Sequence, residues 1–202
     1  MSSFPVHTDT TAPAGSRETL AAVRQAFGFV PNLLGVLAEA PAAAAGYATL
    51  SKLFESTSLT PVEQQVVLLT TSFENRCEYC MAAHSGLAQM RKMPSEVLSA
   101  LRAGQPLPDV RLETLRAFTA AVVTRRATLS AAEVDAFLAA GFTRQQLLEV
   151  LLGVTQKTLS NYVNHLAGTP LDAAFAPLSW RPPAARSTAR SRRFISRRCC
   201  AH

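Results

Sequence analysis

Residues 77–84 of this chain read CEYCMAAH, and the prediction of fold and chemistry starts from this stretch. Two cysteines lie three residues apart, and a histidine follows four residues after the second. In a helix, Cys77, Cys80 and His84 share one face, with roughly 5–6 Å between the Cβ atoms of Cys80 and His84. A thiol beside an imidazole, with a second thiol in reach, suits redox chemistry at sulfur.

The sequence on either side of the cysteines predicts helices. Upstream, residues 60–63 (TPVE) combine an N-cap threonine, a proline at the first helical position and a glutamate three residues after the cap. We therefore assign Glu63 to the cap and not to catalysis. The helix that begins there is expected to end near residues 74–75, and the cysteine helix follows it to about Met90. Together they form a helix–CxxC–helix core.

Further helix signals surround this core, without strand alternation or a hairpin turn. The expected helices span about residues 16–27, 41–54, 94–104, 112–122, 130–141 and 143–166, with a short apolar segment at 31–37. The last helix is the longest and apolar enough to lie centrally. The sequence thus predicts an all-α bundle of roughly eight helices at residues 16–180, a flexible N-terminus at 1–15, and a disordered arginine-rich tail at 181–202.

The net charge of +6 belongs to the tail. Residues 181–202 hold seven arginines and no acidic residue, so 13 basic and 14 acidic residues remain in 1–180, a net charge of −1. The domain offers no argument for nucleic-acid binding. We interpret the tail as a non-functional extension, and an electrostatic arm for nucleic acid or an anionic membrane is the alternative.

The compartment is inferred from signals that the sequence lacks. The N-terminus has no charged head followed by an apolar core, as a secretory signal would, and no apolar run approaches the ~18 residues that span a bilayer. The four cysteines form a CxxC pair and an adjacent pair, residues 199–200, which is not a disulfide framework. We expect a cytoplasmic protein without a membrane partner.

The cysteine pair has a redox interpretation and two structural ones. A structural zinc ion normally takes four ligands, and Cys77, Cys80 and His84 supply three, which leaves only the distant His165. Buried, inert cysteines are the other alternative. Redox chemistry needs no missing ligand, so we favour it and expect neither a metal nor an organic cofactor. His84 then serves as the base for Cys80, unless it is a buried histidine with one satisfied hydrogen bond.

The residues alone leave open which cysteine attacks a substrate. Cys77 lies nearer the helix N-terminus, where the macrodipole lowers a thiol pKa, whereas Cys80 lies nearer His84.

A family resemblance extends this interpretation. The run ENRCEYCMAAHSGLA at 74–88 resembles the signature of the alkyl hydroperoxidase D (AhpD-like) and carboxymuconolactone decarboxylase superfamily, and LSNYVNHLAGTPLD at 159–172 is similar to the C-terminal helix of one subgroup. The likeness is best over about residues 45–125. It implies an AhpD-like helical bundle that forms a homo-oligomer, a trimer or hexamer, with thiol-dependent peroxidase activity. It also implies that Cys80 attacks the peroxide, that Cys77 resolves it, and that an external dithiol, thioredoxin or lipoyl-type reductant regenerates the pair.

The chain departs from the family's proton relay at two positions. Gln65 stands where the family has a glutamate, and Tyr79 stands where it has a histidine. As hypotheses, Gln65 orients His84, and Tyr79 donates a hydrogen bond to a peroxide oxygen. His165 either reaches the site from the last long helix or pins the end of that helix.

Three other functions remain as alternatives. A thiol–disulfide oxidoreductase or redox sensor would use the same cysteines without turning over peroxide. A non-catalytic helical oligomer would hold them as structural residues. Ring-lactone decarboxylation is disfavoured, because that side of the superfamily generally lacks the cysteine pair.

Overall fold

The computed structural model describes residues 4–183 of the chain, and all regular structure in that range is helical. This confirms the all-α prediction. The elements are η1 (Ala14–Ser16), α1 (Arg17–Phe27), α2 (Asn32–Leu37), α3 (Pro41–Glu55), α4 (Pro61–Glu74), α5 (Glu78–Met90), α6 (Ser95–Ala103), α7 (Val110–Thr124), α8 (Ala131–Ala139), α9 (Arg144–Ala167) and η2 (Ala173–Leu178), where η marks a 3-10 helix.

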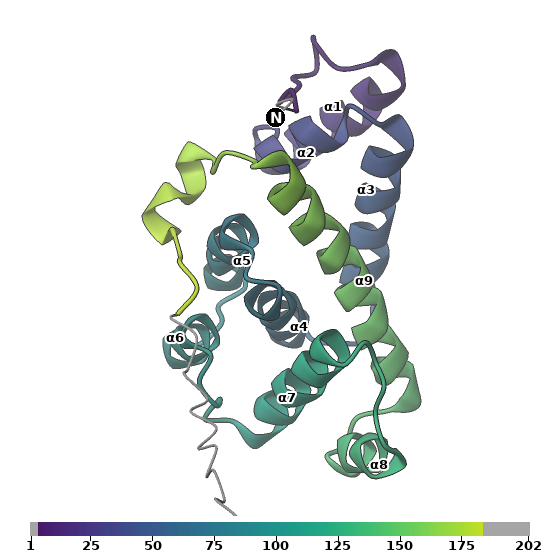
Figure 1. Ribbon diagram of the computed structural model, residues 1–202, viewed down its shortest axis with the longest axis vertical. Helices are drawn as coiled ribbons and strands as arrows, with labels where there is room; N and C mark the ends of the chain where they lie inside the picture. The colour runs from purple at the N-terminus through teal and green to yellow at the C-terminus, as the bar shows by residue number, and fades with distance from the viewer. Residues whose placement is uncertain (1–3, 184–202) are drawn as a thin grey trace, which may run out of the picture.

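Helices α4 and α9 form the centre of the molecule (Figure 1). Every side chain of α4 from residue 63 to 72 is buried, and the helix contacts α3, α5, α6, α7 and α9. A helix that is buried all round lies inside its fold. Helix α9 runs along α3 and α4 and also contacts α2, α5 and α7, which confirms the central position expected for the last long helix.

The approach of α9 to its neighbours depends on Gly153. A Cβ atom at this position would lie 2.5 Å from the ring of Phe54 on α3 and 2.9 Å from Val67 on α4. Both distances are shorter than real Cβ contacts, so a residue without a side chain lets the three helices meet here.

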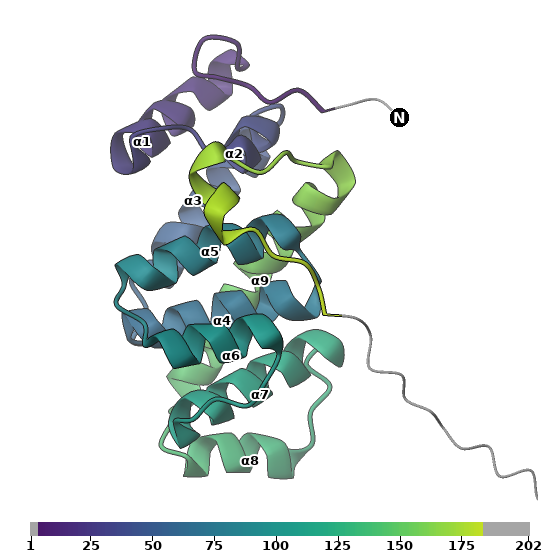
Figure 2. The same cartoon turned by 90° about the vertical axis from the view of Figure 1, so that its left-hand side faces the viewer.

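The buried apolar side chains form two clusters along the length of the molecule. Figure 2 shows α1–α3 at one end and α7 and α8 at the other, with α4 and α5 between them. The larger cluster includes Leu69, Leu115 and Phe137. The second includes Leu20 and Leu33 and also contains both Cys77 and Cys80. The thiols therefore lie inside an apolar core.

The helix starts predicted from capping patterns are present. Glu63 Oε2 accepts from the backbone N–H of Thr60 at 2.8 Å, and Glu63 N donates to Thr60 Oγ1 at 3.3 Å. Glu63 Oε1 also accepts from Arg111 Nε at 2.9 Å, which joins α4 to α7. The assignment of Glu63 to the cap is confirmed. Reciprocal caps of the same kind start α8 at Ser130 and α9 at Thr143.

Some segments differ from the expectation. The short apolar segment is a helix, α2, so the described residues hold nine α-helices where roughly eight were predicted. The segment before α1, expected to be flexible, contacts the domain: His7 N donates to Gly35 O at 3.1 Å, and Ala12 is buried. On α1, Leu20 is buried, whereas Phe27 at the end of the helix is exposed. The tail expected at 181–202 lies, beyond Pro183, outside the described residues.

No helix in the described part of the chain combines the length and the apolar character that crossing a bilayer requires.

Candidate active site

The turn between α4 and α5 places the two thiols. Arg76 adopts a left-handed conformation, with φ of 55°, and Cys77 N donates to Ser72 O at 2.9 Å, which closes the end of α4. Cys77 then becomes the N-cap residue of α5, and Cys80 lies in its first turn. Both cysteines are free, and each is 1% exposed. The predicted helix–CxxC–helix unit therefore places the two thiols side by side in the core.

Helix α9 supplies the polar side chains around the sulfurs. Lys157, Ser160, Asn161 and Asn164 are spaced so that they share one face of α9, and all four are buried. Three of them contact Cys80 Sγ: Asn164 Nδ2 at 3.3 Å, Ser160 Oγ at 3.7 Å and Lys157 Nζ at 3.9 Å. Asn164 Nδ2 also lies 3.9 Å from Cys77 Sγ. One helix thus presents several donors to Cys80.

His84 is buried between two partners. Its Nδ1 lies 3.0 Å from Gln65 Oε1, and its Nε2 lies 2.6 Å from Lys157 Nζ. An ammonium group has no acceptor, so Lys157 donates to Nε2 and the imidazole is neutral, with its Nδ1–H donating to Gln65. Burial, and then the charge of Lys157, hold the pKa of His84 well below its usual value. Gln65 makes the contact that the orienting hypothesis requires.

The two thiols have opposite pKa shifts. Burial alone would raise the pKa of Cys80, but a hydrogen bond from the Cys77 thiol and the charge of Lys157 outweigh it and lower the pKa to about 5. The hydrogen bond that Cys77 gives to Cys80, together with burial, raises the pKa of Cys77. For Lys157, burial alone would lower the pKa, but the negative charge on Cys80 outweighs it and raises the pKa. Cys80 and Lys157 therefore form a buried thiolate–ammonium pair.

The hydroxyl of Tyr79 is hydrogen-bonded to two other parts of the chain. Its hydroxyl donates to Asp172 Oδ2 at 2.5 Å and accepts from the backbone N–H of Leu33 at 3.2 Å. Burial, and then the carboxylate of Asp172, raise its pKa. The hypothesis that Tyr79 donates to a peroxide oxygen is wrong for this arrangement, because its one proton is already shared with Asp172.

His165 lies at the surface near the cysteines. It is exposed and lines a hollow of about 340 Å³ together with Cys77 and Asn164. Its neighbour Asn164 contacts both sulfurs through Nδ2. Asn161 instead accepts from Asn75 Nδ2 at 3.0 Å and holds the end of α4. The two interpretations of His165 itself therefore stay predictions.

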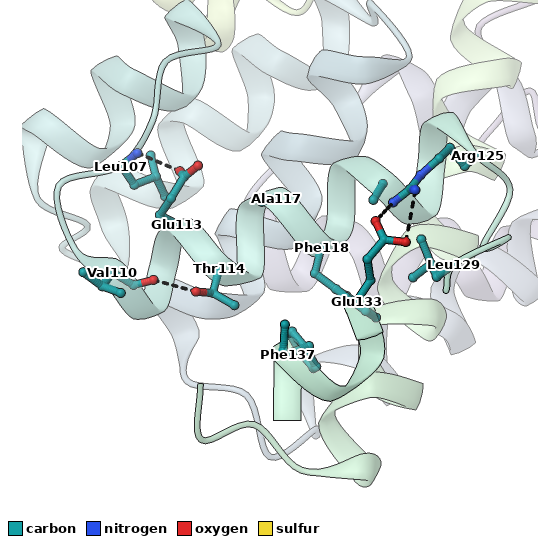
Figure 3. A pocket seen from close by; sticks show the side chains of 12 residues that line it. Leu107, Val110, Glu113, Thr114, Ala117, Phe118, Arg125, Leu129, Glu133 and Phe137 are labelled. Carbon is teal, nitrogen blue, oxygen red and sulfur yellow. Dashed lines mark hydrogen bonds and ion pairs between the residues drawn. The ribbon is translucent and has the colours of Figure 1, made fainter. Parts of the chain in front are cut away.

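A larger hollow of about 420 Å³ lies between α7 and α8 (Figure 3). Its walls include Phe118 and Phe137, whose rings stack with centroids 4.1 Å apart, and the charged pair Arg125 and Glu133. No cysteine or histidine lines it. Cys77, Asn164 and His165 instead line the smaller hollow. Among residues 4–183, no group of three or more His, Cys, Asp or Glu side chains is placed to hold a metal ion.

Sequence reasoning missed Lys157 and Ser160. A recognisable signal was present, because Lys157, Ser160, Asn161 and Asn164 are polar residues at helical spacing on one face of this helix. Such a stripe in a helix expected to lie centrally indicates a buried polar site. The sequence could not show that this stripe faces the cysteines.

Comparison with known proteins matches this chain by its three-dimensional structure and not by its sequence. No protein-family model matches the sequence, and no curated protein matches it either. A solved structure of an alkylhydroperoxidase AhpD core, an uncharacterized peroxidase-related protein from Ralstonia eutropha, superposes with a TM-score of 0.75 at 21% identity, over 85% of this chain and 93% of that one. This chain has the AhpD-like fold.

Two other solved structures share this AhpD-like fold. An uncharacterized peroxidase-related protein from a Silicibacter species has a TM-score of 0.70 at 19% identity, over 81% of this chain and 87% of its own. A cysteine-to-alanine variant of the debrominase Bmp8, in complex with 2,3,4-tribromopyrrole, has a TM-score of 0.70 at 16% identity. The superposition covers 88% of this chain and 95% of that one. The proteins that share this fold thus include peroxidase-related proteins and a debrominase.

Proposed function

We propose that this AhpD-like chain is a thiol-dependent peroxidase in which the Cys80 thiolate attacks the peroxide and Cys77 resolves the product. The observation that carries the proposal is the environment of Cys80 Sγ, which has an ammonium group at 3.9 Å, an amide donor at 3.3 Å and a second thiol beside it. A thiolate that a cation and an amide donor stabilise, with a resolving thiol beside it, is the nucleophile that two-electron peroxide reduction needs.

In the first step the thiolate attacks the terminal oxygen of a hydroperoxide. The O–O bond breaks, Cys80 becomes a sulfenic acid, and the leaving alkoxide needs one proton. The Lys157 ammonium lies beside the sulfur and supplies that proton. His84 accepts from Lys157 and is held by Gln65, so it positions the lysine. We thus replace the expected role of His84, a base for Cys80, by that of a positioning residue.

In the second step Cys77 resolves the sulfenic acid. The Cys77 sulfur attacks the Cys80 sulfur, the S–S bond forms, and hydroxide leaves with the Cys77 proton as water. The raised pKa of Cys77 keeps that proton available until this step. The cycle consumes one peroxide and leaves one disulfide, which an external thiol reduces.

Single-turnover peroxide consumption tests the proposal. The wild type is compared with Cys77→Ser and Cys80→Ser, with mass analysis of the products. We expect a Cys77–Cys80 disulfide to form as peroxide disappears, and sulfenic acid to accumulate on Cys80 in Cys77→Ser. Disulfide exchange without peroxide consumption would instead establish a thiol–disulfide oxidoreductase. Inertness in both assays would leave a structural role for the pair.

Reductive debromination is a second candidate, favoured by the likeness to Bmp8 over 88% of this chain. The same dithiol could supply the two electrons: an aryl bromide takes a proton and releases bromide while Cys77 and Cys80 form their disulfide. Bromide release from 2,3,4-tribromopyrrole by the reduced protein, lost in Cys80→Ser, would establish this activity. Disulfide formation with peroxide and no bromide release would exclude it for this substrate.

A further inference from the structure

The hollow of about 340 Å³ opens where the start of α5 meets the end of α9. Cys77 lines it, whereas Cys80 is not among its lining residues. The sulfur that a molecule in this hollow meets first is therefore that of Cys77. The complete lining is Arg76, Cys77, Glu78, Tyr79, Asn164, His165, Gly168 and Thr169.

Two buried acceptors in this lining lack a hydrogen-bond partner. Asn164 Oδ1 and Thr169 Oγ1 are unpaired among the described residues, and Asn164 as a whole is only 5% exposed. The two residues are neighbours in space, because Thr169 N donates to Asn164 O at 3.2 Å across the end of α9. A buried polar atom without a partner destabilises the fold, and a ligand that brings a donor removes this cost.

The two acceptors differ in their distance from the sulfurs. The side-chain amide of Asn164 already contacts both cysteines through Nδ2, so its Oδ1 lies beside the reacting atoms. Thr169 makes no such contact with either sulfur among the described residues, although it lines the same hollow as Cys77. A ligand that satisfies both carries a donor at its reactive end and a second donor a short distance behind it.

We propose that this hollow binds the reductant of the cysteine pair, a small thiol that carries an amide N–H a short distance from its sulfur, and that this thiol attacks Cys77. The S–H arrives at Asn164 Oδ1, and the amide N–H binds Thr169 Oγ1. The inference deepens the proposed function and needs from it only that Cys77 and Cys80 form a disulfide. The rim carries Arg76 and Glu78, of opposite charge, so net charge does not select the thiol.

The exchange balances in two steps. The thiol gives its proton to solvent, its sulfur bonds to Cys77, and the Cys77–Cys80 bond breaks with Cys80 leaving as thiolate. A second thiol then attacks the mixed disulfide, and Cys77 leaves and takes up a proton. Exchange is faster when the leaving thiol has the lower pKa. The lowered pKa of Cys80, with Lys157 beside it, favours attack on Cys77 over attack on Cys80.

The site of attack is tested on the full chain with Cys199→Ser and Cys200→Ser, so that no other thiol interferes. The disulfide is formed with diamide and not with peroxide, so a failed peroxidase assay does not affect the result. The protein is pulsed with N-acetylcysteamine and trapped with iodoacetamide, and the tryptic peptide 77–91 is fragmented. We expect the cysteamine adduct on Cys77 and the alkyl group on Cys80. The reverse pattern would overturn the proposal.

The recognition of the amide is tested with a matched pair of thiols. N-acetylcysteamine and 2-mercaptoethyl acetate differ by one N–H replaced by an ester oxygen. At equal thiolate concentration we expect the amide to reduce the disulfide roughly 3- to 10-fold faster, the effect of one hydrogen bond.

Two variants at the same position provide the control. Thr169→Val should bring the rate ratio close to one, and Thr169→Ser should keep it. The ratio is internal to each variant and so does not depend on how much protein is folded. A ratio near one in the wild type, or a ratio unchanged in Thr169→Val, would refute the recognition of the amide.

Discussion

Lys157 is the residue that most changes the picture of the site drawn from the sequence. It brings a cation to Cys80 Sγ and, on its other side, donates to His84 Nε2 at 2.6 Å. Gln65, which carries no charge, occupies the remaining nitrogen of the imidazole. In this arrangement the charge that offsets the thiolate is on α9, and the histidine stays neutral.

The alkylation rate of Cys80 should follow its thiolate fraction. Because the pKa of Cys80 is lowered to about 5, its reaction with iodoacetamide should rise with pH through that value and level off above it. Replacing the cation in Lys157→Met should move the midpoint upward by at least one pH unit, toward the ordinary thiol value of about 8.5. Peptide mapping after pulsed alkylation measures both curves.

The exposed Lys52 provides the control. Lys52→Met also removes one positive charge, but at an exposed position where solvent and salt screen it. Its midpoint should match that of the wild type. An unchanged midpoint in Lys157→Met would contradict the thiolate–ammonium pair.

Tyr79 should matter for stability and not for chemistry. In Tyr79→Phe, Asp172 loses the donor at 2.5 Å and the backbone N–H of Leu33 loses its acceptor. Leaving buried polar groups unpaired should lower the free energy of unfolding by about 1–3 kcal/mol, measured by urea denaturation. The exposed Tyr162 is the matched control, and Tyr162→Phe should change little. If Tyr79→Phe were as stable as the wild type but no longer reacted with peroxide, the Tyr79 hydroxyl would take part in the chemistry.

At the scale of elements, the middle of α9 both packs against its neighbouring helices and carries the polar side chains of the site. Gly153 lets the helix approach α3 and α4, and the polar stripe that begins one turn later, at Lys157, faces the cysteines. The position of the ammonium group relative to Cys80 therefore depends on how closely α9 packs.

Gly153→Ala should destabilise the protein although alanine is the better helix former. The added Cβ would lie 2.5 Å from the Phe54 ring, and overpacking of this kind costs about 1–3 kcal/mol. Gly46 on α3 is the matched control, because a Cβ there meets nothing within 4 Å. Gly46→Ala should stabilise by about 0.5–1 kcal/mol from helix propensity alone. Chemical denaturation of both variants measures the contrast, and equal effects of the same sign would contradict the close approach.

At the scale of the whole molecule, subunit assembly stays a prediction from the family resemblance. Sedimentation equilibrium should give a mass of three or six chains of 21.7 kDa. Large apolar side chains that remain exposed on α9, Leu148, Tyr162 and Leu166, are consistent with a covered surface. A monomer at micromolar concentration would contradict the prediction.

Most of the fold was predictable because its signals are local. The cap at residues 60–63, the reciprocal caps that begin at Ser130 and Thr143, and the long final helix all depend on residues within a few positions of one another. Helix α2 was not predicted as a helix, because six residues give too little periodicity to separate a helix from an apolar segment.

The sequence by itself determined that the chain is helical, that Cys77 and Cys80 lie at the start of one helix, and that Gln65 and His84 belong to adjacent helices. Only the tertiary structure decided the charge state of the site. Lys157 is 77 residues from Cys80 in the sequence, and Asp172 is 93 residues from Tyr79. Ionisation in a buried site depends on which charges share the same few ångströms, and packing, not spacing in the chain, brings those charges together.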